Sequence, residues 1–111
     1  MEWSFDLLAE DEQVAWRRLS TFAGSFDLQA AEAICGDDRL GSRAMSDRVA
    51  GLVDKSIVRR EVHGDAARFR LLETIREYGR ERLRDAGEED VTSFRYRDWY
   101  VELAKIGRAH V

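Results

Sequence analysis

The sequence FRLLETIREY, at positions 69–78, changes within ten residues from a strand pattern to a helix pattern. Phe69 and Leu71 alternate with arginines, as in a strand with one buried and one exposed face. Upstream, LVDKSIV at positions 52–58 makes the reverse change, and HGD at 63–65 is a hairpin-turn signal. Helix, strand, turn, strand, helix is the order of a winged-helix domain. We therefore predict a mainly α-helical winged helix with a two-stranded β-hairpin wing and an additional C-terminal helix.

Apolar residues at helical spacing predict the other elements. We expect helices at about 10–22, 28–35, 42–55, 73–86 and 89–106, and a first strand that starts at Ile57. Asp27 is the expected N-cap of the second helix. Gly24, Gly36 and Gly87 are expected to end helices. The third helix should bury a stripe that contains Met45, Val49, Leu52 and Val53.

The composition favours one domain with solvated helices. The chain has 111 residues, of which 44% are hydrophobic and 36% charged, and it contains no proline. Its net charge is −4, and DNA-binding domains usually carry a basic field. The charge balance therefore counts mildly against nucleic acid as the main partner.

No catalytic or metal-binding pattern stands out in the sequence. The eight glycines form no phosphate-binding loop, and His63 and His110 lack a ligand-type neighbour at helical spacing. Cys35 shares a face with Ala31 and Ile34, so we expect a small buried hydrophobic residue. A single cysteine and the lack of a long apolar run favour the cytoplasm, without membrane contact. We predict no catalytic residues and no metal site.

Two groups of basic residues are candidates for DNA contacts. In the third helix they are Arg43, Arg48 and Lys55, which are opposed by Asp47 and Asp54. In the wing they are Arg59, Arg60, Arg68 and Arg70, opposed by Glu61 and Asp65. The wing arginines could bind phosphate groups, or they could form a solvated face or meet an acidic neighbouring domain. The acidic balance of the whole chain favours the second interpretation.

The last helix carries more aromatic side chains than one small domain should bury. Phe94, Tyr96, Trp99 and Tyr100 point in more than one direction around the helix. We expect this surplus to lie against a partner surface. The isolated chain should then either self-associate through the last helix or leave Trp99 exposed to solvent.

Three ordered motifs resemble a known family: LSTFAGSFDLQAAEAIC at 19–35, LVDKSIV at 52–58 and RLLETIREY at 70–78. They are similar to the winged-helix domain of STAND-type, NB-ARC-like ATPases in LuxR-like and SARP-like transcriptional regulators, especially of actinobacteria. The resemblance covers about residues 3–104. It implies a linker from an upstream ATPase domain at 1–9, the winged helix at 10–87, and a helix at 88–111 that leads into helical repeats.

The resemblance also implies a function. In that family the winged helix packs on the nucleotide-binding domain and holds the ADP-bound resting state, while DNA binding usually belongs to other domains. The parent would bind ATP or ADP, and this part would hold no cofactor. Its partners would be the nucleotide-binding domain and the repeats of the same chain. Leu71, Leu72, Glu73 and Arg76 would lie near the nucleotide and the domain interface.

One departure from the family matters. Related domains often carry Met-His-Asp where this chain has Leu71, Leu72 and Glu73. Leucine cannot donate a hydrogen bond to a phosphate. The function expected from the sequence is a non-catalytic regulatory module between domains, and the alternative is a winged helix that binds DNA directly.

Overall fold

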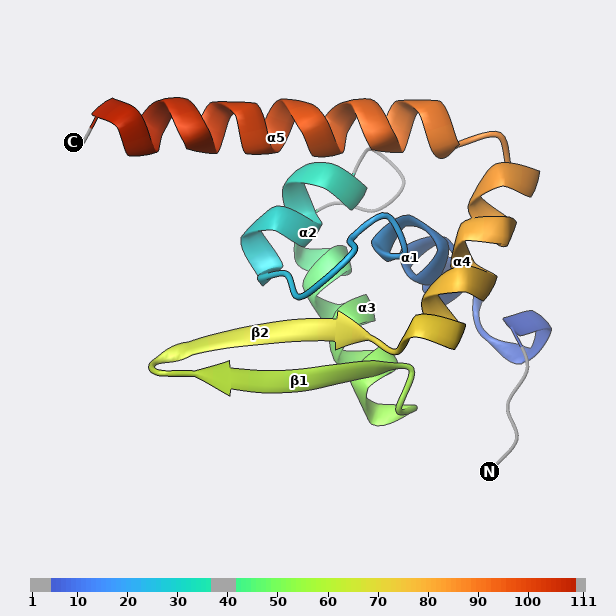
Figure 1. Cartoon of the computed structure of the whole chain (residues 1–111). Helices are drawn as coiled ribbons and strands as arrows, with labels where there is room; N and C mark the ends of the chain where they lie inside the picture. Colours follow the sequence, from blue (N-terminus) through green and yellow to red (C-terminus); the bar gives the residue numbers. More distant parts are fainter. Residues whose placement is uncertain (1–4, 37–41, 110–111) are drawn as a thin grey trace.

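The computed structural model describes residues 5–36 and 42–109, without the side chains of 6, 42, 43, 63 and 106–109. The elements follow the order of a winged helix (Figure 1). They are η1 (Phe5–Leu7), α1 (Glu10–Leu19), α2 (Leu28–Cys35), α3 (Ser42–Asp54), β1 (Val58–His63), β2 (Ala66–Leu71), α4 (Glu73–Asp85) and α5 (Glu89–Ala109). The predicted fold class is confirmed: a mainly helical domain with a two-stranded antiparallel hairpin.

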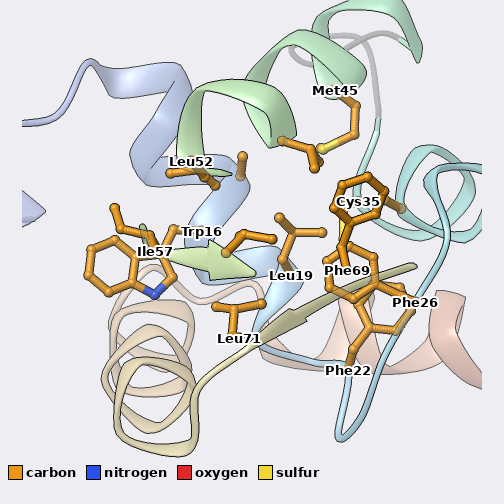
Figure 2. Packing of buried hydrophobic residues seen from close by; sticks show 14 of the residues in the cluster. Trp16, Leu19, Phe22, Phe26, Cys35, Met45, Leu52, Ile57, Phe69 and Leu71 are labelled. Atoms are coloured by element: carbon orange, nitrogen blue, oxygen red, sulfur yellow. The ribbon is translucent and has the colours of Figure 1, made fainter. Parts of the chain in front are cut away.

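The core lies around α1, which packs against α3 and α4. Trp16 and Leu19 of α1 are fully buried, with Leu52 of α3 and Ile57 beside them (Figure 2). The Trp16 indole N–H donates to the Ile75 carbonyl at 3.0 Å and thereby fastens α4 to α1. A buried tryptophan normally needs such a partner. The expected core stripe of α3 is confirmed, since Met45, Val49 and Leu52 are buried and Val53 is half-buried.

The prediction that the first helix continues to Phe22 is wrong, because α1 ends at Leu19. The Ser20 hydroxyl donates to the Trp16 carbonyl at 2.9 Å, and the chain then turns. Phe22 is still buried, but it stacks on Phe26 with ring centroids 4.6 Å apart. An apolar residue at helical spacing can thus belong to the core without belonging to the helix.

The second helix is confirmed in detail. Asp27 is its N-cap and accepts a hydrogen bond from the Ala30 N–H at 2.8 Å. Cys35 lies fully buried at its end, and burial raises the pKa of the thiol to about 12. It is therefore a small core residue rather than a nucleophile.

The hairpin follows directly from α3. The expected strand start at Ile57 is wrong by one residue, because Ile57 donates to the Leu52 carbonyl at 2.9 Å and so closes the end of α3. β1 pairs with β2 from Val58↔Leu71 to His63↔Ala66. Gly64 has φ of 65° in the two-residue turn, a backbone conformation that suits glycine. One further bridge, between Phe26 and Phe69, ties β2 to the segment before α2.

The last two helices enclose the core from the other end. Gly79 of α4 crosses α1 so closely that a Cβ there would lie 1.8 Å from the Ser20 hydroxyl. α5 lies along α2 and extends past it (Figure 1). Of the two outcomes expected for the last helix, an exposed Trp99 is not found, because Trp99 is half-buried against the core. Self-association stays a prediction. The exposed large hydrophobic residues of α5 are Phe94, at 64%, and Val91, Tyr100, Val101 and Leu103. No helix in the described part of the chain has the length and apolarity needed to span a membrane.

Candidate functional site

A hollow lies where α3, β1 and the start of α4 meet. This wing hollow has a volume of about 450 Å³ and is lined by Val53, Ser56, Ile57, Val58, Arg59, Arg60 and Leu72. Leu72 is the N-cap of α4 and is 45% exposed. Leu72, a candidate residue of the domain interface, thus lines the same hollow as Arg59 and Arg60, which are candidate DNA contacts. Both predicted functions therefore concern the same surface.

The four residues expected at the domain interface are not equivalent in the structure. Leu71 is buried in the core, whereas Leu72 is exposed. The Arg76 Nε donates to the Phe22 carbonyl at 2.8 Å, and its Nη1 lies 3.5 Å from the Glu73 carboxylate. Arg76 thus holds α4 to the turn after α1. Among these residues, Leu72 and Glu73 are the ones that a partner could reach.

Several candidate DNA-contact residues bind other parts of this domain. The Lys55 ammonium pairs with the buried Glu12 carboxylate at 2.5 Å. Arg68 donates to the Ser25 hydroxyl at 2.9 Å and to its carbonyl at 3.0 Å, and lies 3.9 Å from Asp27. Binding a phosphate would compete with these contacts.

The remaining candidates are divided between α3 and the hairpin. Arg48 is half-buried, and its Nε is enclosed without a hydrogen-bond partner among the described residues. The side chain of Arg43 lies outside the described part of the structure. Arg59 and Arg60 are exposed. They are the candidates best placed to meet a partner.

The surface of α3 beside the hairpin is unsuited to a polyanion. Asp47 and Asp54 are both exposed on α3. A second hollow of about 230 Å³ lies between α3, the start of α2 and the hairpin, and is lined mainly by apolar residues, with Asp54 and Arg60 at its polar side. A recognition helix that enters the major groove would bring both carboxylates toward phosphates. The chemistry of this surface favours a protein surface as its partner.

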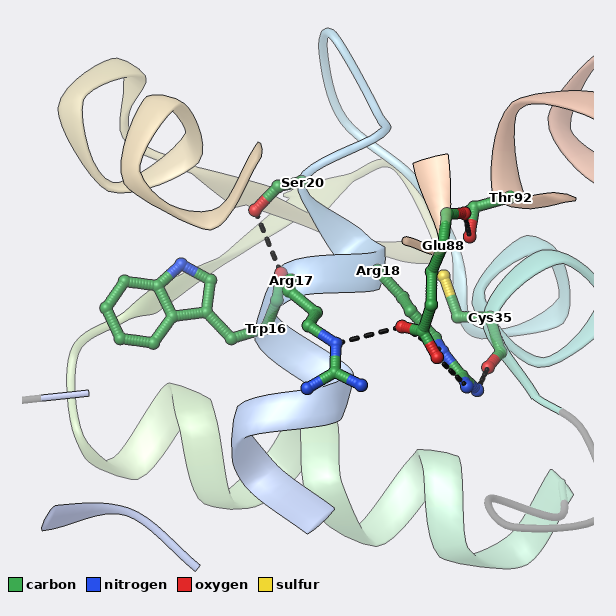
Figure 3. A network of polar contacts seen from close by, with 7 residues as sticks. All are labelled: Trp16, Arg17, Arg18, Ser20, Cys35, Glu88 and Thr92. Carbon is green, nitrogen blue, oxygen red and sulfur yellow. Dashed lines mark hydrogen bonds and ion pairs between the residues drawn. The ribbon is translucent and has the colours of Figure 1, made fainter. Parts of the chain in front are cut away.

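A polar network that the sequence did not predict joins α1, α2 and the start of α5 (Figure 3). Glu88 accepts hydrogen bonds at 2.8 Å from both Arg17 and Arg18, and Arg18 also donates to the Cys35 carbonyl at 3.0 Å. Burial alone would raise the pKa of Glu88, but the two arginines outweigh it and lower that pKa to about 2. The adjacent arginines of α1 were the only sequence signal, and their partner lies 70 residues away.

Within residues 5–36 and 42–109, no group of histidine, cysteine, aspartate and glutamate side chains is arranged to hold a metal ion. The wing hollow itself is lined by apolar residues and by the positively charged Arg59 and Arg60.

The order α2, α3 and hairpin defines this protein as a helix-turn-helix domain with a wing. A model of the winged helix-turn-helix domain matches residues 8–84, and the chain belongs to this family. It is 44% identical over 104 residues to "Putative HTH-type transcriptional regulator Rv0890c" of Mycobacterium tuberculosis H37Rv and equally to Mb0914c of Mycobacterium bovis, which carries the same description. It is 36% identical over 110 residues to "Uncharacterized protein Rv0894" of M. tuberculosis H37Rv.

These alignments include 94% of this chain for the first two relatives and 98% for the third. The chain spans only 12% of the length of the first two and 28% of the third. No solved structure matches it significantly.

Proposed function

We propose that this domain is a non-enzymatic regulatory winged helix that binds a neighbouring protein domain and does not itself read a DNA sequence. The names of two relatives support a role in transcriptional regulation. The resemblance to STAND-type regulators supports the nucleotide-binding domain of the same chain, in a cytoplasmic protein, as that neighbour. The winged helix would pack on that domain and stabilise its resting state.

The chemistry of α3 carries this proposal. Its exposed surface presents Asp47 and Asp54, while Lys55 is paired with Glu12. The net charge of −4 adds an unfavourable field for DNA. A domain that reads bases through this helix would have to bring uncompensated carboxylates to the phosphate backbone.

The start of α4 supports a protein contact more than a nucleotide contact. In the resemblance, Leu72 and Glu73 stand nearest to the nucleotide of the parent. Leu72 offers only apolar contact, and the Glu73 carboxylate would repel a phosphate. These residues do not fit an ATP or ADP phosphate. We therefore assign them to contact with protein, so that any effect on nucleotide release would be indirect, through the domain interface.

Direct DNA binding is the second candidate function. It is favoured by the exposed Arg59 and Arg60 on the wing and by the names of the relatives. A wing can hold the DNA backbone without reading its sequence. Such binding would be weak and strongly dependent on salt.

A titration of duplex DNA against the 111-residue chain separates the two functions. We expect only non-specific binding, with Kd between about 10⁻⁴ and 10⁻⁶ M at physiological salt. Arg59→Ala should weaken it for every sequence, and Arg48→Ala should not change sequence preference. Specific binding with Kd of about 10⁻⁸ M, lost in Arg48→Ala, would contradict the proposal.

The outer face of α5 provides a further proposed contact, with downstream helical repeats of the parent or with a second copy of this chain. Val91, Phe94 and Val101 are 57%, 64% and 51% exposed. Phe94 and Val101 are one heptad apart and therefore lie on one face. Sedimentation of the chain and of Phe94→Ser would distinguish these partners, because only self-association depends on concentration and is lost in the variant.

A further inference from the structure

The outer edge of β1 is an open strand edge. Phe69 donates to the Phe26 carbonyl and accepts from the Phe26 N–H, both at 2.8 Å. Its backbone groups therefore point away from β1, so Arg60↔Phe69 is a non-hydrogen-bonded pair of the antiparallel ladder. Because the pattern alternates, the N–H and C=O groups of Arg60 and Val62 also point away from β2.

Both residues of this edge lie at the surface. Arg60 is exposed, and Val62 is 65% exposed. By contrast, Val58 is 1% exposed, so the edge is covered at the start of β1 and open toward the turn. Within the described part of the chain, no backbone hydrogen bond occupies the edge at Arg60 or Val62. Two donors and two acceptors are thus available to an added strand.

The two faces of the hairpin beside this edge differ in chemistry. The inner face is mostly apolar: Val62 lies there with Ala67 and Phe69, and Arg60 shares this face because the register places it opposite Phe69. The wing hollow, with Val53 and Leu72 in its lining, continues this apolar face toward α3 and α4. An added strand that points alternate side chains inward would place apolar groups there.

The outer face carries an excess of positive charge. The register places Arg59 directly opposite Arg70, and like charges in such a pair destabilise a hairpin. Arg70 has Glu61 as a neighbour at 3.8 Å, while Arg59 is exposed. An acidic side chain on an added strand would relieve this repulsion. Charged side chains on an edge also exclude strands of the wrong charge.

We propose that β1 is a docking strand: an extended protein segment with alternating apolar and acidic residues adds to the hairpin along the edge formed by Arg60 and Val62. Backbone hydrogen bonds supply the affinity, and the two faces select the side chains. The inference rests on the proposed protein-binding role and names the form of the partner segment. DNA is a poorer occupant, because phosphates cannot donate to the two edge carbonyls.

A seven-residue peptide of alternating valine and aspartate is the probe. With peptide at ten times its Kd, hydrogen exchange of the Arg60 and Val62 amides should slow about tenfold, since only the free state exchanges. The amides of Arg59 and Glu61 already bond to β2, so they serve as internal controls. A peptide that fails to bind, or that protects other amides, would overturn the proposal. Duplex DNA that protects the Arg60 and Val62 amides while the peptide does not would assign the edge to DNA.

A matched pair of variants separates the backbone bond from the side chain. Val62→Pro removes an N–H that points away from β2, so the hairpin should remain intact, as the exchange of the Glu61 amide will verify. Val62→Ala keeps that N–H. We therefore expect Val62→Pro to weaken peptide binding about fivefold more than Val62→Ala does. Equal binding by the two variants would refute strand addition. Arg59→Glu should prefer a valine–lysine peptide, and an unchanged preference would refute the charge selection.

These measurements need only this chain, whereas the proposed contact of Leu72 is tested in the longer parent. A failure of strand addition at β1 can therefore be distinguished from a failure of the proposed domain contact at Leu72.

Discussion

Glu88, at the start of α5, pairs with Arg17 and Arg18 of α1, and Arg18 in turn donates to the Cys35 carbonyl of α2. The Glu88 carboxyl has a pKa of about 2 in the folded chain, below its ordinary value of 4.5. It therefore stabilises the fold above about pH 4.5, and this contribution is lost as the pH falls from 4.5 toward 2. We expect Glu88→Gln to lower the free energy of unfolding by about 1–3 kcal/mol near neutral pH.

Urea unfolding at several pH values tests this expectation. The difference between the wild type and Glu88→Gln should shrink to a small part of its neutral-pH value near pH 2, where about half of the wild-type carboxyl is protonated. Glu81→Gln is the control, because Glu81 is exposed on α4. A difference that stays constant with pH would mean that packing rather than charge gives Glu88 its effect.

Arg59 offers a second test at a single residue. It lies opposite Arg70 on the exposed face of the hairpin, so Arg59→Glu should replace a repulsion by an attraction. We expect the isolated chain to become more stable by about 0.5 kcal/mol, measured by thermal unfolding at low salt. Arg59→Gln should give about half this gain. A loss of stability in both variants would show that Arg59 supports the hairpin through packing instead.

The sequence predicted the two adjacent leucines better than it predicted the basic residues. Leu71 alternates with arginines in the strand pattern, which predicts a buried side chain, and it is buried. Leu72 follows at the change from strand to helix spacing, and it is exposed at the helix start. Both results depend on local geometry. The engagement of Lys55 with Glu12 and of Arg68 with Ser25 joins residues 43 positions apart. A charge count along the sequence could not reveal these pairs, because they depend on how the helices pack.

At the scale of elements, α3 and α4 end in the same motif with different residues. In α3 Ser56 has φ of 65°, and the next N–H closes onto Leu52; in α4 Gly87 has φ of 73°, and the next N–H closes onto Leu83. This is the Schellman arrangement, which favours glycine at the left-handed position. Ser56 therefore carries strain that Gly87 avoids.

We expect Ser56→Gly to stabilise the chain by about 0.5–1 kcal/mol and Gly87→Ser to destabilise it by about 1 kcal/mol. The pair can be compared by chemical denaturation under identical conditions. If Ser56→Gly were destabilising, the serine side chain would have to make a contact that outweighs its backbone strain.

Helix positions were predicted more reliably than helix ends. The apolar stripes located all five helices, and Asp27 was recognised as a cap because its carboxylate suits the free N–H groups of a helix start. The end of α1 was missed, because Ser20 turns the chain while Phe22 continues the stripe. The close crossing at Gly79 was also hidden from the sequence, since it depends on Ser20 of another helix.

At the scale of the whole molecule, the two ends of the domain differ in how firmly they are fixed. α5 is held by Glu88 and by Arg95, which donates to the Gly36 carbonyl at 2.9 Å. At the other end, the wing hollow and the open edge of β1 leave apolar and charged groups exposed. Contacts that hold the first part of α5, together with an open wing, are compatible with the contacts proposed at the two ends of the domain.

The adjacent residues Leu71 and Leu72 separate stability from partner contact within this molecule. Leu71 is 6% exposed, so Leu71→Ala should lower the free energy of unfolding of the isolated chain by about 2–5 kcal/mol. Leu72 is 45% exposed at the wing hollow, so Leu72→Asp should change that free energy by less than about 0.5 kcal/mol. In the nucleotide-binding parent proposed above, however, Leu72→Asp would place a charge in the proposed apolar interface. It should therefore speed the release of ADP and increase protease cleavage between the two domains, while Glu77→Asp, on the exposed part of α4, should do neither. A folded Leu72→Asp parent with unchanged ADP release and unchanged cleavage would contradict the contact, because an interface that includes Leu72 cannot accept a buried carboxylate without cost.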